Sequence, residues 1–334
     1  MDTAEFRYEL PATSIAQEAV EPRHAARLLD TRDLGDHRFS DLPGLLREGD
    51  LVVVNHTRVR RARLRGRRLT GGAVELLVLS PVGDGRWEAL ARPARRLRAG
   101  TEIEVGGSRV VVEDDPVEGR VVLRSSSGDL EREMERTGEV PLPPYFTGHL
   151  EDPERYQTVY ARRPGSAAAP TAGLHFTGAV LDALSRRGVA VTGIELEVGL
   201  DTFRPITEDR VEAHEMHSER LVVDEATVAA VEETRRSGGR VVAVGTTVVR
   251  ALESAATDGI LRPLDARTDL FIRPGHRFRV VDLLVTNFHV PGSTLVVLVA
   301  AFMGERWRQA YQVALERGYR FLSFGDAMLA ERSP

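Results

Sequence analysis

The residues best equipped for chemistry lie between two apolar segments near the end of the chain. Residues 286–294 read TNFHVPGST and hold one imidazole, one amide, three hydroxyls and an aromatic ring. His289 is the titratable group of this stretch, and a histidine can take or give a proton near neutral pH. The alternative interpretation is that His289 and Asn287 only satisfy buried backbone groups.

The flanking segments predict that a strand and a helix position this loop. Residues 281–285 (VDLLV) form a short apolar run typical of a buried strand, and residues 295–302 are apolar and long enough to begin a buried helix. Pro291 and Gly292 indicate a turn, and Ser293 or Thr294 can cap the helix that follows. Because ligands of α/β folds bind where strands end and loops begin, the sequence predicts chemistry at this junction.

Four more polar loops follow apolar, strand-like runs: residues 55–58 (NHTR), 199–204 (GLDTFR), 245–247 (GTT) and 325–326 (GD). If these strands are neighbours, the loops gather at one edge. The Gly-Thr-Thr junction presents free backbone N–H groups to an anion, but it lacks the lysine and spacing of a nucleoside triphosphate loop. A further loop of small residues, 164–177, holds Thr171 and His175. The pattern predicts an α/β enzyme with a composite site that needs no metal.

Composition excludes several classes of chemistry. The chain of 334 residues has no cysteine and no lysine, which excludes disulfides, thiolate catalysis and Schiff bases. Its net charge of −5 argues against non-specific nucleic-acid binding by the whole molecule but not against a local basic patch. The N-terminus does not resemble a signal peptide, and no apolar run reaches the roughly 20 residues of a membrane span. We therefore expect a cytoplasmic protein without membrane contact.

The spacing of His214 and His217 allows both to share one helix face, as in some metal sites. No third ligand is evident nearby, and the zinc spacing HExxH is absent. A metal is therefore not expected.

Composition changes along the chain and predicts two domains. From about residue 69 to 124, short apolar runs are separated by Gly-, Asp- and Pro-rich turns, which is typical of a small all-β barrel. We expect this barrel, residues 60–146, to be inserted into an α/β domain formed by residues 1–59 and 147–334. Residues 58–68 hold seven arginines in eleven positions, either a solvated strand face or a contact surface for a phosphate backbone.

The amino-acid sequences of these loops resemble those of one family, the S-adenosylmethionine:tRNA ribosyltransferase-isomerases of queuosine biosynthesis. The matching segments are GDLVVVNHTRV, VPLPPY, YQTVYARRPGSAAAPTAGLHFT, VGLDTFRPI, AHEMHSE, VVAVGTTVVRALES, LFIRPG, VVDLLVTNFHVPGSTLVVLVAAFMG and YRFLSFGDAML. They cover almost the whole chain in the family's order. The resemblance implies a barrel-like α/β main domain with an inserted small β-barrel, which agrees with the organisation above.

The resemblance also implies a reaction. The ribosyl part of S-adenosylmethionine moves to 7-aminomethyl-7-deazaguanine at the wobble position of a tRNA with a GUN anticodon and rearranges to epoxyqueuosine, while adenine and methionine leave. S-adenosylmethionine is a substrate, and no cofactor is expected. The expected assembly is a monomer, with a dimer as the alternative.

Roles follow for individual side chains under this resemblance. His289 or His175 is the base, and Asp326 is an acid or an orienting carboxylate. The expected substrate-binding residues are Asn55, Thr57, Arg58, Thr171, Phe176, Glu197, Asp201, Thr202, Arg204, Thr246, Thr247, Arg250, Asn287, Phe288, Ser293 and Thr294. Among them, Phe176 or Phe288 is expected to stack on adenine. The three arginines are expected to contact anions, with plain structural ion pairs as the alternative.

Two departures from the family pattern leave other functions open. Glu197 and Asp201 stand where the family usually has histidine and glycine, and they add two carboxylates to the expected edge. Carboxylates repel phosphate and attract cations. One alternative is a paralogue that uses S-adenosylmethionine with a small-molecule acceptor, and the other is a tRNA-binding homologue without catalysis.

Overall fold

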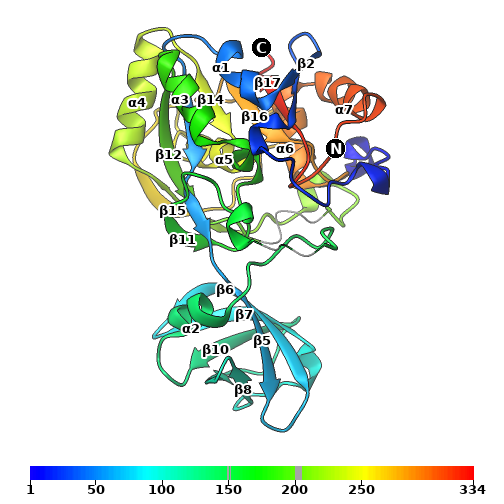
Figure 1. Cartoon of the computed structure of the whole chain (residues 1–334), viewed down its shortest axis with the longest axis vertical. Coiled ribbons are helices and arrows are strands. Elements are labelled where there is room, and N and C mark those ends of the chain that lie inside the picture. Colours follow the sequence, from blue (N-terminus) through cyan, green and yellow to red (C-terminus); the bar gives the residue numbers. More distant parts are fainter. Residues whose placement is uncertain (149, 151, 200–204) are drawn as a thin grey trace. The chain divides into compact units, whose positions relative to one another are not determined.

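The computed structural model describes residues 1–148, 150, 152–199 and 205–334. They divide into two compact units (Figure 1). The first unit comprises residues 1–58, 143–163 and 169–334, and the second comprises residues 59–142 and 164–168. The sequence predicted an inserted domain at residues 60–146. These domain bounds remain a prediction.

A nine-stranded mixed sheet forms the centre of the first unit, in the order β15-β13-β12-β3-β14-β16-β17-β1-β2. Its strands are β1 (Arg27–Asp30), β2 (Gly35–Arg38), β3 (Leu51–Asn55), β12 (Ala190–Leu196), β13 (Glu219–Val223), β14 (Val241–Val244), β15 (Leu264–Thr268), β16 (Leu283–Asn287) and β17 (Ala327–Glu331). The short strands β4 (Thr57–Val59) and β11 (Arg163–Ser166) pair separately. The expected α/β class with an all-β insert is confirmed.

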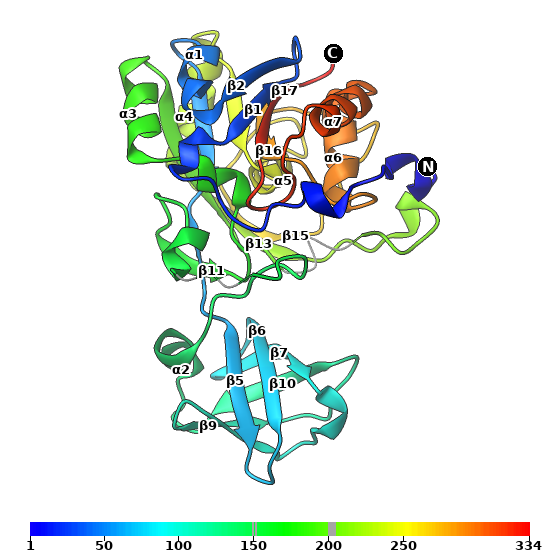
Figure 2. The same ribbon diagram turned by 45° about the vertical axis from the view of Figure 1, so that its right-hand side comes forward.

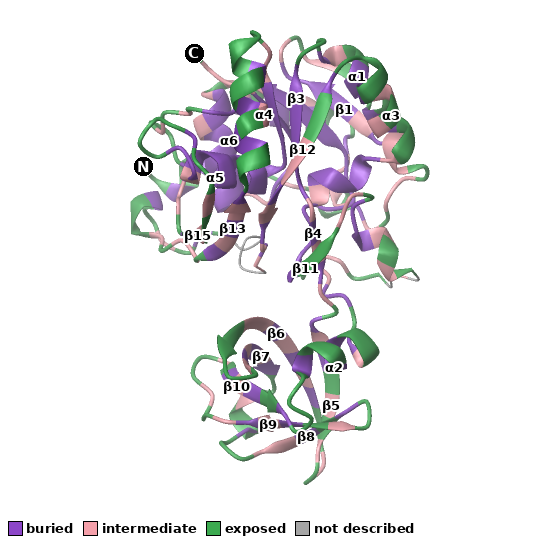
Figure 3. Cartoon of the chain, turned by 90° about the vertical axis from the view of Figure 1, so that its left-hand side faces the viewer, coloured by how far each residue is buried: buried purple, intermediate pink, exposed green. Residues whose placement is uncertain are grey.

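The middle of the sheet explains why the polar loops meet. Strands β12, β3, β14 and β16 are parallel neighbours, so their carboxyl ends share one edge. Strands β3, β14 and β16 are buried along their whole length (Figure 3). Their continuous Val and Leu runs are typical of parallel strands that are covered on both faces. The expected gathering of strand ends is therefore confirmed for residues 55, 244 and 287.

Helices cover both faces of this sheet. They are α1 (Leu42–Leu45), α3 (Gly178–Arg186), α4 (Glu225–Arg236), α5 (Thr246–Ser254), α6 (Thr294–Met303) and α7 (Arg306–Glu316). Helices α3 and α4 pack on β12, whereas α6 packs on β17 and against α7 (Figure 2). Ser293 caps α6 by accepting a hydrogen bond from the Val296 N–H at 3.4 Å, as predicted. Within the described residues, no helix is both long enough and apolar enough to cross a bilayer.

The second unit is a closed antiparallel barrel with strand order β10-β7-β6-β5-β8-β9. Its elements are β5 (Arg63–Arg68), β6 (Ala73–Gly83), β7 (Arg86–Arg92), the 3-10 turn η5 (Ala94–Arg96), β8 (Glu102–Val105), β9 (Ser108–Val112), β10 (Arg120–Ser125) and α2 (Leu130–Thr137). Alternate residues such as Leu64, Leu76 and Ala89 point inward and form its core. Closure leaves none of these strands with an unpaired edge.

Candidate active site

Asn287, the last residue of β16, is the centre of a buried hydrogen-bond network. Its Oδ1 accepts from the Thr171 hydroxyl at 3.0 Å. Its Nδ2 donates to the Asp326 carbonyl at 3.3 Å and to Nε2 of His175 at 3.2 Å. Because a carbonyl only accepts, the Asp326 contact fixes the orientation of the amide. Nε2 of His175 is then an acceptor, and its proton resides on Nδ1.

His289 lies two residues further on and lines both pockets at this edge of the sheet. Its side chain is 8% exposed, and burial lowers its pKa to about 3. Nε2 lies 3.0 Å from the Thr286 hydroxyl, and Nδ1 makes no hydrogen bond to any described residue. With the proton on Nε2 donated to Thr286, the Nδ1 lone pair can accept a proton. The neutral imidazole has a lone pair to offer, but burial makes it a weaker base than an exposed histidine.

His175, in the 3-10 turn η7 (Thr171–His175), occupies a different position. Its ring stacks on Phe39 at a centroid distance of 4.9 Å, and its Nε2 lone pair is taken by Asn287. Burial, reinforced by the guanidinium of Arg320, lowers its pKa to about 4. Neither pocket that His289 lines includes His175. The geometry therefore favours His289 as the histidine that reaches a ligand, with His175 behind Asn287.

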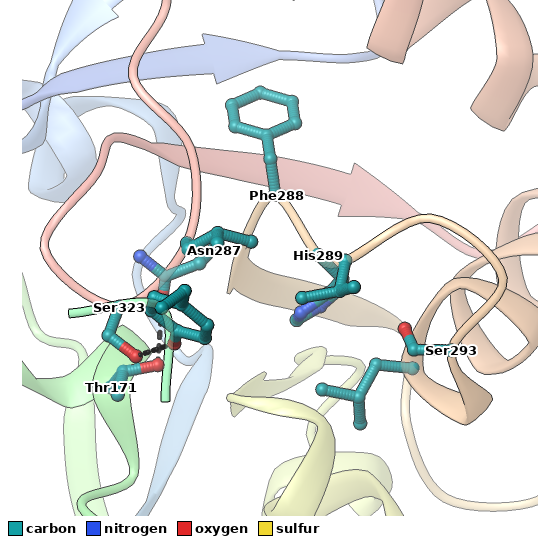
Figure 4. A pocket seen from close by; sticks show the side chains of 10 residues that line it. Thr171, Asn287, Phe288, His289, Ser293 and Ser323 are labelled. Atoms are coloured by element: carbon teal, nitrogen blue, oxygen red, sulfur yellow. Dashed lines mark hydrogen bonds between the residues drawn. The ribbon is translucent and has the colours of Figure 1, made fainter. Parts of the chain in front are cut away.

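Two adjoining pockets lie against this network. One is lined by Pro170, Thr171, Ala172, Val198, Gly245, Thr246, Thr247, Thr286, Asn287, His289 and their neighbours. The other adds Tyr145, Ser293 and Ser323 (Figure 4). Because both include Thr171, Asn287 and His289, a ligand that spans them would pass these three side chains.

The first pocket ends at the N-terminus of α5. A helix leaves its first N–H groups without intrahelical partners. The N–H of Val248 bonds the Gly245 carbonyl, and those of Thr246 and Thr247 have no partner among the described residues. Gly245 has φ +90°, a conformation that favours glycine. The Thr247 side chain is 7% exposed, and its Oγ1 is buried without a hydrogen-bond partner in the described chain. Free N–H groups, an orphan hydroxyl and the helix dipole together favour an anion.

The two rings expected to stack on adenine lie in aromatic clusters instead. Phe288 points away from Asn287 and His289 (Figure 4) and packs against Phe321 at a centroid distance of 4.8 Å. Phe176 packs against Phe39 at 5.0 Å. Both residues are fully buried, and Phe288 is among the residues that line the second pocket, so stacking on adenine stays a prediction.

Several other expected binding residues hold the backbone at the sheet edge. Asn55 donates to the Leu196 carbonyl at 2.9 Å and accepts from the Thr57 hydroxyl at 3.0 Å. The Asp326 carboxylate accepts from the N–H groups of Arg27 at 2.9 Å and Arg320 at 2.8 Å. These contacts fit an orienting role for Asp326, the second of its two expected roles.

The expected anion-binding arginines are occupied by carboxylates. Arg250 is buried against Glu219, with additional bonds to backbone carbonyls. Arg58 pairs with Glu154 at a more exposed position. Glu197 lies 3.6 Å from Arg220, so this family departure has a cation beside it. These contacts fit the structural alternative stated above for the arginines.

The remaining predictions concern three binding residues and the two histidines that were considered as metal ligands. Asp201, Thr202 and Arg204 lie outside the described residues. His214 contacts Glu208, and His217 contacts Glu219, each at 3.0 Å. Within the described part of the chain, no three metal-ligating side chains of His, Cys, Asp or Glu form a group.

Four residues at this site were not singled out from the sequence. Tyr145 and Ser323 line the second pocket and bond each other through their hydroxyls, and burial raises the pKa of Tyr145 to about 12. Tyr8 donates to the His289 carbonyl, and the Tyr311 oxygen accepts from the His289 N–H at 3.2 Å. Tyr145 and Ser323 belong to the segments VPLPPY and YRFLSFGDAML, and the family resemblance of these segments could have indicated them as site residues. The sequence gives no such indication for Tyr8 and Tyr311, because only the folded chain brings them next to His289.

Comparisons with known proteins agree on one family. A family model described as queuosine biosynthesis protein matches residues 3–330. Curated relatives from Heliobacterium modesticaldum and Symbiobacterium thermophilum, both named S-adenosylmethionine:tRNA ribosyltransferase-isomerase, are each 50% identical over 98% of this chain and 99% of their own length. The crystal structure of S-adenosylmethionine tRNA ribosyltransferase from Thermotoga maritima is 36% identical, with a TM-score of 0.55, over 97% of this chain and 99% of that one.

Proposed function

The chain belongs to the queuosine biosynthesis protein family, and from this premise we propose that it is an S-adenosylmethionine:tRNA ribosyltransferase-isomerase. It transfers the ribosyl part of S-adenosylmethionine to 7-aminomethyl-7-deazaguanine at the wobble position of a tRNA with a GUN anticodon. The products are epoxyqueuosine-tRNA, adenine and methionine. Near full-length identity of 50% to relatives of that name supports this function over the small-molecule and non-catalytic alternatives.

One observation carries the proposal for the site. The pocket that His289 lines continues to the N-terminus of α5, where Thr247 keeps a buried, unpaired hydroxyl. S-adenosylmethionine combines a carboxylate with a ribose whose 5′ carbon bears acidic hydrogens. An anion site and a base in one pocket match these two features.

The first chemical step is proton removal from the 5′ carbon. The neighbouring sulfonium stabilises the carbanion, so the C–H electron pair stays on carbon while the proton goes to Nδ1 of His289. Burial keeps His289 neutral at pH 7 and ready to accept. The Thr286 hydroxyl orients the ring by accepting from Nε2. The imidazolium can then supply a proton in a later step, such as the departure of adenine.

The methionine carboxylate binds at the start of α5. The N–H groups of Thr246 and Thr247 and the Thr247 hydroxyl donate to it, and the helix dipole adds attraction. Thr171 and Asn287 lie between this end and His289 and contact the ribose, with the free lone pair of each oxygen accepting from ribose hydroxyls. Ser293 lines the second pocket, and Thr294 follows it as the first residue of α6.

The test is incubation with S-adenosylmethionine and a tRNA that bears 7-aminomethyl-7-deazaguanine. Adenine release is followed by chromatography, and the modified nucleoside is identified by mass. Adenine together with the mass of epoxyqueuosine is the expected result. Adenine without tRNA modification would indicate a different acceptor, and no adenine from folded protein would overturn the proposal.

A further inference from the structure

The barrel carries a surface of arginines that the fold does not use. Residues 59–142 hold sixteen arginines and fourteen acidic residues, a net charge of +2, in a chain whose net charge is −5. Basic charge is therefore concentrated in this unit. Since opposite charges at ion-pair distance cancel, the arginines that remain unpaired decide where the field is positive.

The structure separates these arginines into two groups. Many have a carboxylate within 4 Å, including Arg63 with Glu75 at 3.9 Å and Arg65 with Glu139 at 3.0 Å. Four of the seven arginines of the run at residues 58–68 have such a partner, namely Arg58, Arg60, Arg63 and Arg65. The paired members of the barrel also include Arg60, Arg86, Arg109, Arg120, Arg124 and Arg136.

The arginines of the second group have no carboxylate within 4 Å among the described residues, and three of them stand on β5 and η5. The others are Arg61, Arg68, Arg92, Arg98 and Arg132. Arg67, Arg95 and Arg96 are exposed, and their guanidinium groups form no ion pair or hydrogen bond with any described residue. Glu104 stands opposite Arg67 in the β5–β8 ladder without reaching ion-pair distance. Arg68, whose side chain leaves β5 on the opposite face from that of Arg67, donates to the Arg96 carbonyl at 3.5 Å and so joins η5 to the end of β5.

The backbone holds this surface in place. Leu97, directly after η5, is fully buried in the barrel core, so the turn is anchored from beneath. The acidic residues of α2, Glu131, Glu133 and Glu135, lie on a separate element and pair with other arginines where they pair at all. Arginines that are fixed at the backbone but free at the guanidinium suit bidentate contacts with phosphate oxygens.

We propose that Arg67, Arg95 and Arg96, the β5–η5 arginines, bind the phosphate backbone of the tRNA substrate. The proposal rests on the proposed function for the identity of the RNA. Such contacts supply affinity and salt dependence without reading sequence. They assign RNA docking to a turn of the barrel rather than to the whole arginine run.

The test compares two triple variants with the same change in charge. Arg67→Gln, Arg95→Gln and Arg96→Gln are combined in one protein, and Arg109→Gln, Arg120→Gln and Arg124→Gln, which remove paired arginines of the same barrel, are combined in the control. Binding of an unmodified tRNA transcript with a GUN anticodon is measured by filter retention from 50 to 300 mM salt. Thermal unfolding of both variants checks that the barrel is intact.

The first variant should raise the Kd for tRNA by about tenfold or more and reduce the slope of log Kd against log salt by about one per lost contact. The control should stay within about twofold. Replacement of the same three residues by lysine should restore most of the slope. Equal loss in both variants, no loss in either, or loss only toward anionic phospholipid vesicles would overturn the proposal. Because tRNA binding is measured without turnover, the result can be interpreted even if the protein proves to lack the proposed catalytic function.

Discussion

The edge of the large sheet and the β5–η5 turn of the barrel use polar residues in opposite ways. At the sheet edge, Asn287, His175 and Asp326 are buried and engaged in mutual hydrogen bonds. At the barrel turn, Arg95 and Arg96 are exposed and unengaged. A buried site whose polar groups are hydrogen-bonded to each other strengthens electrostatic interactions and favours chemistry on a small substrate. An exposed surface whose arginines have no ion-pair partner favours the binding of a large polyanion whose backbone can adapt to it.

The strongest test of this contrast is removal of the base. His289→Ala should lower adenine release by about 10³-fold or more, since general-base catalysis contributes that order of magnitude. Binding of S-adenosylmethionine, measured by calorimetry, should change only a few-fold. His37→Ala, at a half-buried histidine on β2, is the control. Normal turnover of His289→Ala would remove this residue from the mechanism.

Buried and exposed arginines should differ in stability. Arg250→Met removes the guanidinium from the buried Glu219 carboxylate and should lower the free energy of unfolding by about 3–5 kcal/mol. Arg96→Met should change it by no more than about 0.5 kcal/mol. Urea denaturation measures both. Equal effects would mean that the two regions do not differ in the way proposed.

The buried histidines should make stability depend on pH. The pKa of His289 is lowered to about 3 and that of His175 to about 4, whereas an unfolded histidine has a pKa near 6.5. Between these values the unfolded chain binds more protons, so stability is fully present above pH 6.5 and is lost as the pH falls. At pH 5 the loss should be about 2 kcal/mol per histidine relative to pH 8.

Urea midpoints at both pH values measure this loss. His289→Gln and His175→Gln should each flatten the dependence. A dependence that persists in both glutamine variants would show that other groups cause it.

The smallest effect concerns one hydroxyl. Thr247→Val removes the unpaired Oγ1 and should raise the KM for S-adenosylmethionine about tenfold, the value of one hydrogen bond to a charged group. Stability should not fall, because no hydrogen bond within the protein is lost. Thr192→Val, which removes a hydroxyl bonded to Thr227, is the control. An unchanged KM would exclude Thr247 from the anion site.

The sequence could predict what depends on local pattern. Polar loops after apolar runs indicated the shared strand edge, and Ser293 was expected at a helix start. Phe288 directly follows the end of β16, where strand alternation no longer applies, so the direction of its ring (Figure 4) could not be predicted from the sequence.

Contacts between distant residues could not be predicted in this way. Asn287 meets Thr171 and His175 across separations of 116 and 112 residues, and no periodic pattern encodes that meeting. The arginines of η5 stand in a turn without periodicity, whereas the conspicuous run at residues 58–68 is largely neutralised by carboxylates that only the folded barrel brings near.

Hydrogen–deuterium exchange of the full chain, with S-adenosylmethionine alone and with tRNA alone, tests the central assignment most directly. The N–H groups of Thr246 and Thr247 are free of partners in the described structure, so a bound carboxylate should slow their exchange. We predict that S-adenosylmethionine protects residues 246–247 and 287–290 and leaves residues 94–98 unchanged, and that tRNA protects residues 94–98. Protection by S-adenosylmethionine elsewhere, with none at the start of α5, would contradict the account.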